Sequence, residues 1–557
     1  MSLIIPPAFI FFLGIPILLL KGVWRKIGLI ILAVLALIFT FSLQPGTYYT
    51  YKLMSYDLIL LNVDKLSLFI GYIFTIITFF AVLYATTFNK PWLYLFALLY
   101  AGASLGAVFA GDFITLIIFW EIMSLTSTTL VWIHGGDAIS AGYRYLLFHV
   151  IAGSLLLGGV VIQYLSTGNL LVGASITNSW ALLLITLAVG INLGFIPLHT
   201  WLPDTYPKPH IATSVFLSVY TTKAAVYLLA RIATGAIFMG TEIIALMGGI
   251  MAVYGVCFAL MQNNMRKLLS YHIISQIGYM VAGVGLGIAI GINGGMAHAF
   301  NNILYKTLLF MCVGSVIYRT GIEKISQIGG LWKKMHVTAL TFIIAMLSIS
   351  GIPGFNGFVS KGMIITASEN FTILWILLEI ASVGTLLSFL KLGYFVFFRE
   401  WKDVKISEVP ISMQLAQIGV AILCVIIGIY PNILFSILPF QNQYIPYSFS
   451  YIIQASVILG LTAIFFFTIG KKILIPHDPT IKDFDVLYRA FGNGILTLSG
   501  IIANLFSKFY IGIVNLSSVL FSISRSFDKI ENKDINWNMI AFAILLVLII
   551  GIMLVVV

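Results

Sequence analysis

Long apolar runs, each closed by glycine, proline or a charged residue, recur along almost the whole chain. Each run has about the 20 residues that a helix needs to cross the hydrocarbon core of a bilayer. Because a segment in lipid must satisfy its own backbone hydrogen bonds, we interpret the runs as membrane-spanning helices. The predicted spans lie near residues 3–20, 27–43, 66–86, 92–110, 112–133, 145–165, 180–198, 212–235, 241–262, 268–291, 294–318, 336–352, 371–398, 411–436, 449–470 and 537–557.

This pattern predicts an all-α fold, a polytopic membrane helix bundle of about 14–16 transmembrane helices. Basic residues gather in short loops on alternate sides of the runs. The positive-inside rule makes the side with Arg266, Lys267 and Lys334 cytoplasmic and leaves the N-terminus outside. Residues 353–370 fit this threading least well, because Lys361 would lie outside the membrane or in a re-entrant piece.

Two runs are followed by clusters of proline and glycine. These clusters are Pro197, Pro203, Pro207 and Pro209 before the run with Lys223, and Gly351, Pro353, Gly354 and Gly357 before the run with Lys391. Matching interruptions in two halves are typical of transporters built from repeats, whose ion sites lie near the broken helices. Plain loops between spans are the alternative.

The segment from about Phe484 to Asp534 carries polar residues mostly at three- or four-residue steps, which places them on one helix face. A single helix there would be about 75 Å long, far more than a bilayer needs. We predict a lateral amphipathic helix and a final anchor; two further, weakly hydrophobic spans are the alternative. The predicted domains are N-terminal spans at 1–65, a core at 66–470, the lateral helix at 471–536 and a transmembrane anchor at 537–557.

Composition supports a membrane setting. Of 557 residues, 60% are hydrophobic and 9% charged, with a mean hydropathy of +1.07, whereas soluble domains carry about 25% charged residues. The formal charge of +11 comes from short loops between spans, so we expect no nucleic-acid partner. Cys257, Cys312 and Cys424 stand singly in apolar runs, so we predict no metal site and no cofactor.

Few ionisable residues lie inside the runs, and each costs at least about 2.5 to 3.5 kcal/mol on insertion scales. Glu121, in Trp-Glu-Ile-Met-Ser, is about mid-span and needs a cation. Lys223 is also mid-span, among small polar residues that suit close helix packing and a hydrated cavity. A structural ion pair is the alternative to a functional role.

His298, Asn302 and Lys306 follow one another at four-residue steps, which stacks their side chains on one helix face. Imidazole both gives and takes a proton near neutral pH. With water between its members, this series is predicted to relay protons, and Lys391 is the next buried cation along the chain.

Other ionisable residues are weaker candidates. The candidate uptake or accessory residues are His272, His199, Asp204 and Glu379. His272 lies just inside the cytoplasmic edge of its span, where a mere interface residue is an equal alternative. Arg144, His149, Arg231 and Glu242 lie near span edges, where we expect them to reach toward the membrane surface.

In combination these motifs resemble a known family. The sequence Trp201-Leu202-Pro203-Asp204 after Pro197 and His199, Glu121 in its motif, Lys223, and the His298, Asn302 and Lys306 series are similar to the antiporter-like subunits of respiratory complex I and Mrp-type cation/proton antiporters. The stretch 270–280 looks most like the D-type subunit of Mrp antiporters and its relatives in membrane-bound hydrogenases and sulfur reductases. The resemblance covers about residues 60–470, and the predicted tail is similar to that of the longer complex I subunits.

The resemblance implies two inverted five-helix repeats, each with one broken helix. It also implies a hydrated axis along Glu121, Lys223, His298, Lys306 and Lys391, with Glu121 and Lys223 as a switching ion pair. Many relatives have histidine where this chain has Asn302, which cannot be protonated in the working range. Water would have to bridge the neighbouring groups, or the route runs elsewhere.

The function that follows is a proton-translocating subunit of a multisubunit complex in the cell membrane. Its expected partners are other membrane subunits, the lipid bilayer, protons and, in exchange, sodium. An Mrp antiporter, a hydrogenase, a sulfur reductase and complex I would all accept such a subunit, so the complex could be an oxidoreductase although we expect no chemistry in this chain. The alternatives are a self-sufficient secondary transporter and a structural subunit of a redox enzyme; an electron carrier is disfavoured because the sequence has no cysteine cluster or nucleotide-binding glycine loop.

Overall fold

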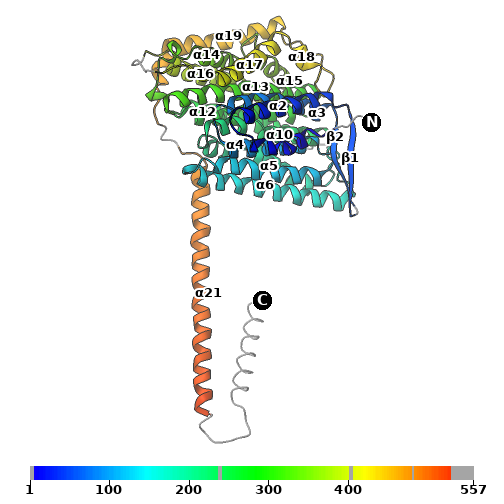
Figure 1. The fold of residues 1–557 in the computed structure, drawn as a ribbon, viewed down its shortest axis with the longest axis vertical. Helices are drawn as coiled ribbons and strands as arrows, with labels where there is room; N and C mark the ends of the chain where they lie inside the picture. Colours follow the sequence, from blue (N-terminus) through cyan, green and yellow to red (C-terminus); the bar gives the residue numbers. More distant parts are fainter. Residues whose placement is uncertain (1–4, 55, 236–240, 401–405, 479–481, 528–557) are drawn as a thin grey trace. The chain divides into compact units, whose positions relative to one another are not determined.

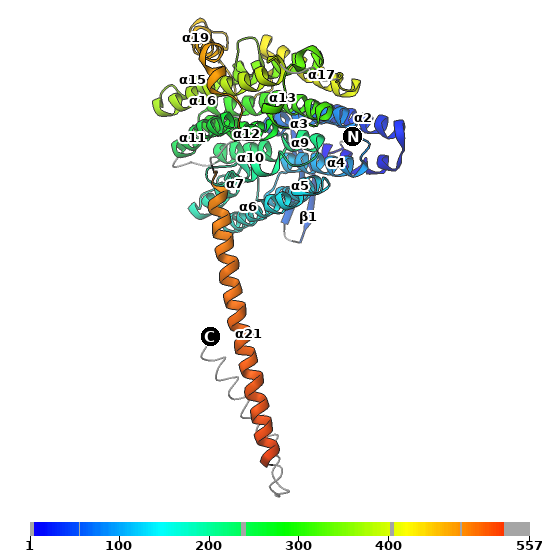
Figure 2. The same ribbon diagram turned by 90° about the vertical axis from the view of Figure 1, so that its left-hand side faces the viewer.

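The computed structural model describes residues 5–54, 56–235, 241–400, 406–478 and 482–527, in two compact units, Met1–Thr480 and Ile481–Val557. Within the first unit the helices lie side by side, from α5 and α6 at one edge to α19 at the other (Figure 1, Figure 2). Its helices are α1 (Pro7–Leu13), α2 (Gly22–Ser42), α3 (Lys65–Ala85), α4 (Pro91–Phe109), α5 (Phe113–Trp132), α6 (Asp137–Thr167), α7 (Ser179–Leu193), α8 (Trp201–Thr205), α9 (Ile211–Leu217), α10 (Thr221–Gly235), α11 (Thr241–Leu260), α12 (Met265–Gly285), α13 (Ala289–Thr320), α14 (His336–Ser350), α15 (Asn356–Ser368), α16 (Thr372–Gly393), α17 (Ile411–Ile429), α18 (Asn432–Phe435), α19 (Phe449–Phe465) and α20 (Lys471–Ile473). Shorter helical turns lie at Ile15–Leu19, Ile325–Gln327, Leu331–Lys333, Tyr394–Phe398 and Phe466–Gly470.

The prediction of an all-α, multi-pass membrane protein is confirmed. Within the described residues, 12 helices are long and apolar enough to cross a membrane, and three shorter apolar helices accompany them. Each predicted span between residues 3 and 470 coincides with a helix. The predicted anchor at 537–557 lies outside the described residues.

A two-stranded hairpin occupies part of the segment predicted to hold only N-terminal spans. Strands β1 (Gly46–Leu53) and β2 (Tyr56–Val63) pair antiparallel, with Gly46 opposite Val63. Tyrosine, threonine, isoleucine and leucine, which fit a pleated surface, fill both strands. The side chain of Asp112, which caps α5, accepts a hydrogen bond from the Ile59 backbone at 2.6 Å. The hairpin is therefore fastened to the junction of α4 and α5.

The two predicted interruptions are present, and they have the same local geometry. Helices α7 and α14 end at Gly194 and Gly351, whose φ angles of 75° and 78° are left-handed. Glycine adopts this conformation without steric cost, and it is the usual way to end a helix. A short helix follows each break, α8 in the first half and α15 in the second.

Helix α15 occupies most of residues 353–370, which the sequence places outside the membrane or in a re-entrant piece. It packs against α13, α16 and α17 and buries Lys361, which is 1% exposed. Arg399, just after α16, donates to the Ile328 carbonyl in the loop before α14, so α16 returns to the side where α14 begins. Helices α14 and α15 together therefore form one crossing. The sequence misses α15 because its glycines and polar residues dilute the apolar pattern.

Glycines bring α11 and α12 into close contact. A Cβ at Gly255 would lie 2.5 Å from the Ser275 nitrogen, and one at Gly278 would lie 2.5 Å from the Ala252 nitrogen. Small residues of this kind allow helices in membranes to pack backbone against backbone. The packing sets α12, with His272, inside the bundle.

The second unit contains α21 (Asp485–Phe527), one uninterrupted helix of 43 residues. At 1.5 Å per residue it is about 65 Å long. Several of its serines bond back to carbonyls of the same helix, among them Ser507 to Asn504. One helix, and not two shorter spans, thus occupies this part of the chain.

Candidate functional site

Among the fully buried ionisable side chains that the structure describes in the first unit, five form one group on four different helices. They are Lys223 on α10, His272 on α12, His298 and Lys306 on α13, and Lys361 on α15. Each is at most 1% exposed. Since charges in a membrane interior are expensive, we take this group as the candidate functional centre.

Electrostatic interactions connect these groups into one series. Lys223 acts on both Lys306 and His298. Lys361 acts on His298 and on His272, and Lys306 also acts on His272. Lys223 of α10 therefore acts on both predicted members of α13, and these two helices pack against each other.

His298 is the best-connected member of the series. Its Nδ1 lies 3.1 Å from the Ser360 hydroxyl, and its Nε2 lies 3.2 Å from Oε1 of Gln276. Ser360 immediately precedes Lys361 on α15. The imidazole thus joins α12, α13 and the helix that follows the second break.

Tyr305 fills the gap that Asn302 leaves in the predicted relay. Its hydroxyl lies 3.3 Å from Nε2 of His298 and accepts a hydrogen bond from Nδ2 of Asn302 at 3.3 Å. The same hydroxyl lies 3.2 Å from Gln276. A hydroxyl both donates and accepts, so it can pass a proton where an amide cannot. Sequence analysis did not identify Tyr305, although it comes three residues after Asn302 and so lies on the same helix face.

Lys306 and His272 both lie beside the aromatic ring of Phe389. The Lys306 ammonium is 5.9 Å from the centre of the Phe389 ring, and the His272 ring is 4.5 Å from it. Neither Lys306 Nζ nor the His272 nitrogens bond to protein atoms of the described residues. Buried polar groups of this kind usually bind ordered water. The structure therefore buries His272 within this group of ionisable side chains.

Lys361 continues the series toward a cavity that Gln454 lines. Its ammonium lies 4.9 Å from the centre of the Tyr279 ring and interacts electrostatically with Glu379. Glu379 in turn accepts a hydrogen bond from Gln454 at 3.0 Å. Gln454 lines a cavity of about 850 Å³ together with Glu369, Gln441, Tyr444 and Tyr451. Lys361 and Glu379 thus lie between His298 and an opening of the bundle.

Lys391 has a different environment from the one predicted. Its ammonium donates to the carbonyl oxygens of Leu260 and Gln262, at 2.6 and 3.1 Å. These carbonyls belong to the end of α11, where helices leave acceptors unsatisfied and favour cations. Lys391 therefore caps α11 in this structure, and its ammonium is directed to backbone oxygens.

Glu121 and Lys223 do not form the expected ion pair in this structure. The Lys223 ammonium donates to the Ser218 carbonyl at 2.8 Å, in the turn between α9 and α10. Half-buried Glu121 rests against α6, where a Cβ at Gly153 would lie 1.8 Å from Oε1. Within the described residues no cation comes within ion-pair distance of Glu121.

The motif residues His199 and Asp204 have structural contacts. His199 is buried beside the Tyr254 ring, 4.8 Å between centres. Asp204 accepts two hydrogen bonds from Arg144, at 2.6 and 3.0 Å, and one from Lys208. Burial alone would raise the pKa of Asp204, but these two cations hold it below its usual range. Arg144 therefore binds α6 to α8, and its side chain remains partly exposed.

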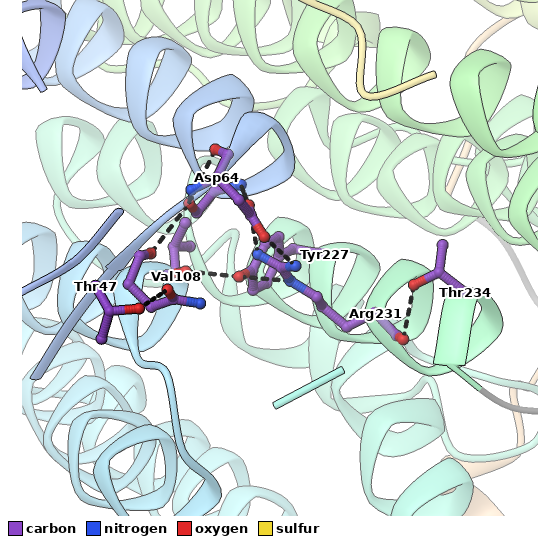
Figure 3. Close-up of polar contacts among 8 residues, drawn as sticks. Thr47, Asp64, Val108, Tyr227, Arg231 and Thr234 are labelled. Atoms are coloured by element: carbon purple, nitrogen blue, oxygen red, sulfur yellow. Dashed lines mark hydrogen bonds and ion pairs between the residues drawn. The ribbon is translucent and has the colours of Figure 1, made fainter. Parts of the chain in front are cut away.

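Two other residues that the sequence places near span edges also have partners in the protein. His149 is completely buried, between α6 and Asn192 of α7. Arg231 forms a two-pronged ion pair with Asp64, at 2.5 and 2.7 Å, and its Nε donates to the Tyr227 hydroxyl (Figure 3). Among the described residues, no three His, Cys, Asp or Glu side chains converge as a metal site would require.

Comparison with known proteins identifies relatives over most of the first unit. The family described as NADH:quinone oxidoreductase/Mrp antiporter, TM, matches residues 110–388. The chain is 33% identical over 357 residues to the uncharacterised protein MJ1309 of Methanocaldococcus jannaschii, which covers 59% of this chain and 73% of that protein. It is 30% identical to a subunit of the Na⁺/H⁺ antiporter of Alkalihalophilus pseudofirmus, over 67% of this chain and 52% of the relative. The chain thus spans only about half the length of that relative.

A solved structure covers nearly the complete chain. A subunit of the membrane-bound sulfane sulfur reductase, an archaeal respiratory membrane complex, superposes with a TM-score of 0.73. The alignment covers 98% of this chain and 99% of that one, with 24% sequence identity. This similarity shows a shared fold.

Proposed function

This chain belongs to the NADH:quinone oxidoreductase/Mrp antiporter transmembrane family, and from that premise we propose that it carries protons across the membrane as one subunit of a larger complex. The observation that carries the proposal is the series of buried ionisable groups Lys223, Lys306, His298 and Lys361, which interact with one another across three helices. A merely structural bundle has no need of four such costly groups.

The proposed route begins in the first half with Glu121 and Lys223. It continues through Lys306 and His298, where the Tyr305 hydroxyl joins His298 to Asn302. Ordered water next to the unpaired Lys306 ammonium completes the connection. The proposal therefore keeps the predicted members and assigns to Tyr305 the bridging that Asn302 cannot do alone.

From His298 the route leaves through the second half. The Ser360 hydroxyl leads to Lys361, whose charge faces Glu379, and Glu379 is bonded to Gln454 at the wall of the outer cavity. We place Lys361 on the route where sequence analysis had Lys391. The reason is that Lys391 is occupied by backbone carbonyls at the end of α11.

Coulomb repulsion gives the series a physical means of passing protons. Two ammonium groups close together in a low-dielectric interior repel strongly, so protonation of one favours release from the other. Lys223 and Lys306 interact in this way. A proton arriving at one end thus favours departure at the other.

The proposal includes other membrane subunits as partners and sodium as the ion exchanged for protons. A relative named as a subunit of a sodium/proton antiporter and the fold shared with a respiratory membrane complex support other membrane subunits as partners. A self-sufficient transporter would work without them. Transport by the isolated chain, reconstituted alone, would favour that second candidate.

The proposal is tested in the native complex, purified with all its subunits and reconstituted into sealed vesicles with a pH-sensitive dye. Glu121→Gln keeps the side-chain size but removes the negative charge, and it is expected to lose most proton transport. The matched control is Cys312→Ala, a buried change on α13 away from ionisable chemistry. Full transport by a correctly assembled Glu121→Gln complex would refute the proposal.

A further inference from the structure

His149 is a fully buried histidine on α6 that the route described above does not use. Its Nδ1 lies 2.6 Å from Oδ1 of Asn192, whose amide nitrogen donates to the Ala188 carbonyl at 3.0 Å. An amide oxygen only accepts hydrogen bonds, so Nδ1 of His149 carries the hydrogen. In the neutral ring the lone pair is therefore on Nε2.

The Nε2 atom is a buried acceptor without a hydrogen-bond partner among the described protein atoms. The rings of Tyr145 and Trp201 stand edge-on to the imidazole, with centres 4.1 and 4.8 Å away. Trp201 is held by a bond from its Nε1 to the Ile191 carbonyl, at 2.9 Å. These contacts fix the ring and leave Nε2 as the one atom that can take a proton.

A carboxyl group lies against the same face of α6. Glu121 Oε1 touches the helix at Gly153, where an added Cβ would be 1.8 Å away. Gly153 comes four residues after His149, and residues four apart share one helix face. The carboxyl group is thus about one turn, roughly 6 Å along the axis, from the level of His149.

Building on the proposed function, we infer that Glu121 and His149 form a proton-exchanging pair in the first half of the chain. The Glu121 carboxyl gives its proton to Nε2 of His149, after a side-chain rotation or through one water. An O–H bond breaks and an N–H bond forms, which leaves a carboxylate and an imidazolium. The pair keeps its net charge, so the step adds none to the apolar interior. Asn192 and Trp201 act as positioning residues.

This pair supplies the cation that Glu121 lacks. Glu121 makes no ion pair with Lys223 in the described structure, because the Lys223 ammonium is bound to the Ser218 carbonyl. A protonated His149 neutralises the carboxylate without any movement of Lys223. The other charges close to it on α6 and α8 are Arg144 and Asp204, which are paired with each other.

The first test is His149→Gln in the complete complex, reconstituted in sealed vesicles. Glutamine can still donate to Asn192 but cannot take up a proton, so we expect proton transport to fall about tenfold or more. His336→Gln, an exposed histidine at the start of α14, is the matched control and should leave the rate unchanged. A normal rate in an assembled His149→Gln complex overturns the inference.

The second test separates proton exchange from a purely structural role. Asn192→Asp keeps the side-chain size and puts a negative acceptor on the Nδ1 hydrogen, which favours the imidazolium. The pH profile of transport should then move to higher pH, whereas Asn192→Leu should only slow transport. An unmoved Asn192→Asp profile refutes the inference, and this variant also decides the matter if His149→Gln fails to assemble.

The same measurements distinguish failure of this inference from failure of the proposed function. If either Glu121→Gln or Lys223→Ala transports protons at the unaltered rate, the proposed function is wrong and the inference falls with it. If those variants lose transport while His149→Gln retains it, only the role of His149 is wrong.

Discussion

At the scale of single residues, Gly153 is important because the Glu121 carboxyl group lies directly against it. The Glu121 carboxyl oxygen occupies the space where any larger residue would place its Cβ, at 1.8 Å. A methyl group there must displace the carboxyl group from α6. The Glu121 carboxyl group can therefore lie against α6 only because residue 153 is a glycine.

We predict that Gly153→Ala lowers proton transport by the assembled complex about tenfold or more, since it moves a proton-carrying group. Gly158→Ala on the same helix is the control, because its Cβ would meet only Leu184, at an ordinary 3.7 Å. Transport is measured in sealed vesicles after assembly is checked. Equal rates for the two variants would contradict the position of Glu121.

Tyr305→Phe tests the bridge beside Asn302. Phenylalanine keeps the ring but removes the hydroxyl shared by His298, Gln276 and Asn302. We expect markedly slower transport, and partial recovery in the double variant with Asn302→His, because imidazole can carry the proton itself. Transport at the unaltered rate by Tyr305→Phe would show that the route avoids the hydroxyl.

The sequence predicts which residues are unusual, but not how each is held. Lys223 and Lys306 could be predicted because charged residues inside apolar runs are rare and costly. Lys361 and His149 could not, since one lies in a glycine-rich break and the other near an apparent span edge. The carbonyl contacts of Lys391 depend on how α11 and α16 pack, which periodicity does not encode.

At the scale of elements, an ion pair joins the beginning of α3 to the last turns of α10. Asp64 caps α3 by accepting a hydrogen bond from the Ser67 backbone at 2.8 Å, and the same carboxylate binds Arg231. Tyr227 extends the contact to the Val108 carbonyl at the end of α4 (Figure 3). Three helices of the first half are thus fastened at one end.

Asp64→Asn is predicted to cost about 1–2 kcal/mol of stability, as expected when a partly exposed ion pair is broken. Asparagine still caps α3, whereas Asp64→Ala also loses the cap, for about 1 kcal/mol more. Thermal unfolding in detergent measures both. Equal melting temperatures for Asp64→Asn and the unaltered protein would show that the pair contributes nothing.

The ion pair between Asp64 and Arg231 also makes the stability of the protein depend on pH. Burial alone would raise the pKa of Asp64, but Arg231 and Ser67 hold it below its usual range. With the folded pKa lowered, the contribution is fully present above the unfolded pKa of about 3.9 and is lost as pH falls through the folded value. The difference between Asp64→Asn and the unaltered protein should therefore shrink in acid.

The hydrophobic pattern predicts membrane-spanning helices well, because a bilayer requires apolar segments of about the same length. Apolar runs of about 20 residues have few interpretations, so the helices between residues 3 and 470 could be placed from the sequence. The hairpin Gly46–Val63 and helix α15 escaped because neither is a long apolar run. Both breaks were visible in advance, since proline and glycine leave a helix few alternatives.

At the scale of the whole molecule, the loops place Lys333 and the hairpin on opposite sides of the membrane. An odd number of crossings separates Lys52 from Lys333 in the threading that puts the N-terminus outside. Both residues are exposed, so both accept a cysteine without loss of buried contacts. Arg266, by contrast, is buried and paired with Glu323, so it is unsuitable for labelling.

Single cysteines at these two sites, with Cys257, Cys312 and Cys424 replaced by alanine, test the orientation. An impermeant thiol reagent added to intact cells should label the Lys52→Cys variant. The Lys333→Cys variant should react only after the cytoplasmic face is opened. The reverse pattern would place the N-terminus inside and invert the path.

The central claim is that buried ionisable groups of both halves work as one proton path, and Lys223 is where the halves meet. Its ammonium interacts with Lys306 and His298 of the second half. The most direct measurement is proton movement into sealed vesicles by the complete complex carrying Lys223→Ala. The account predicts that transport is almost abolished while assembly is intact; transport at the unaltered rate would contradict it.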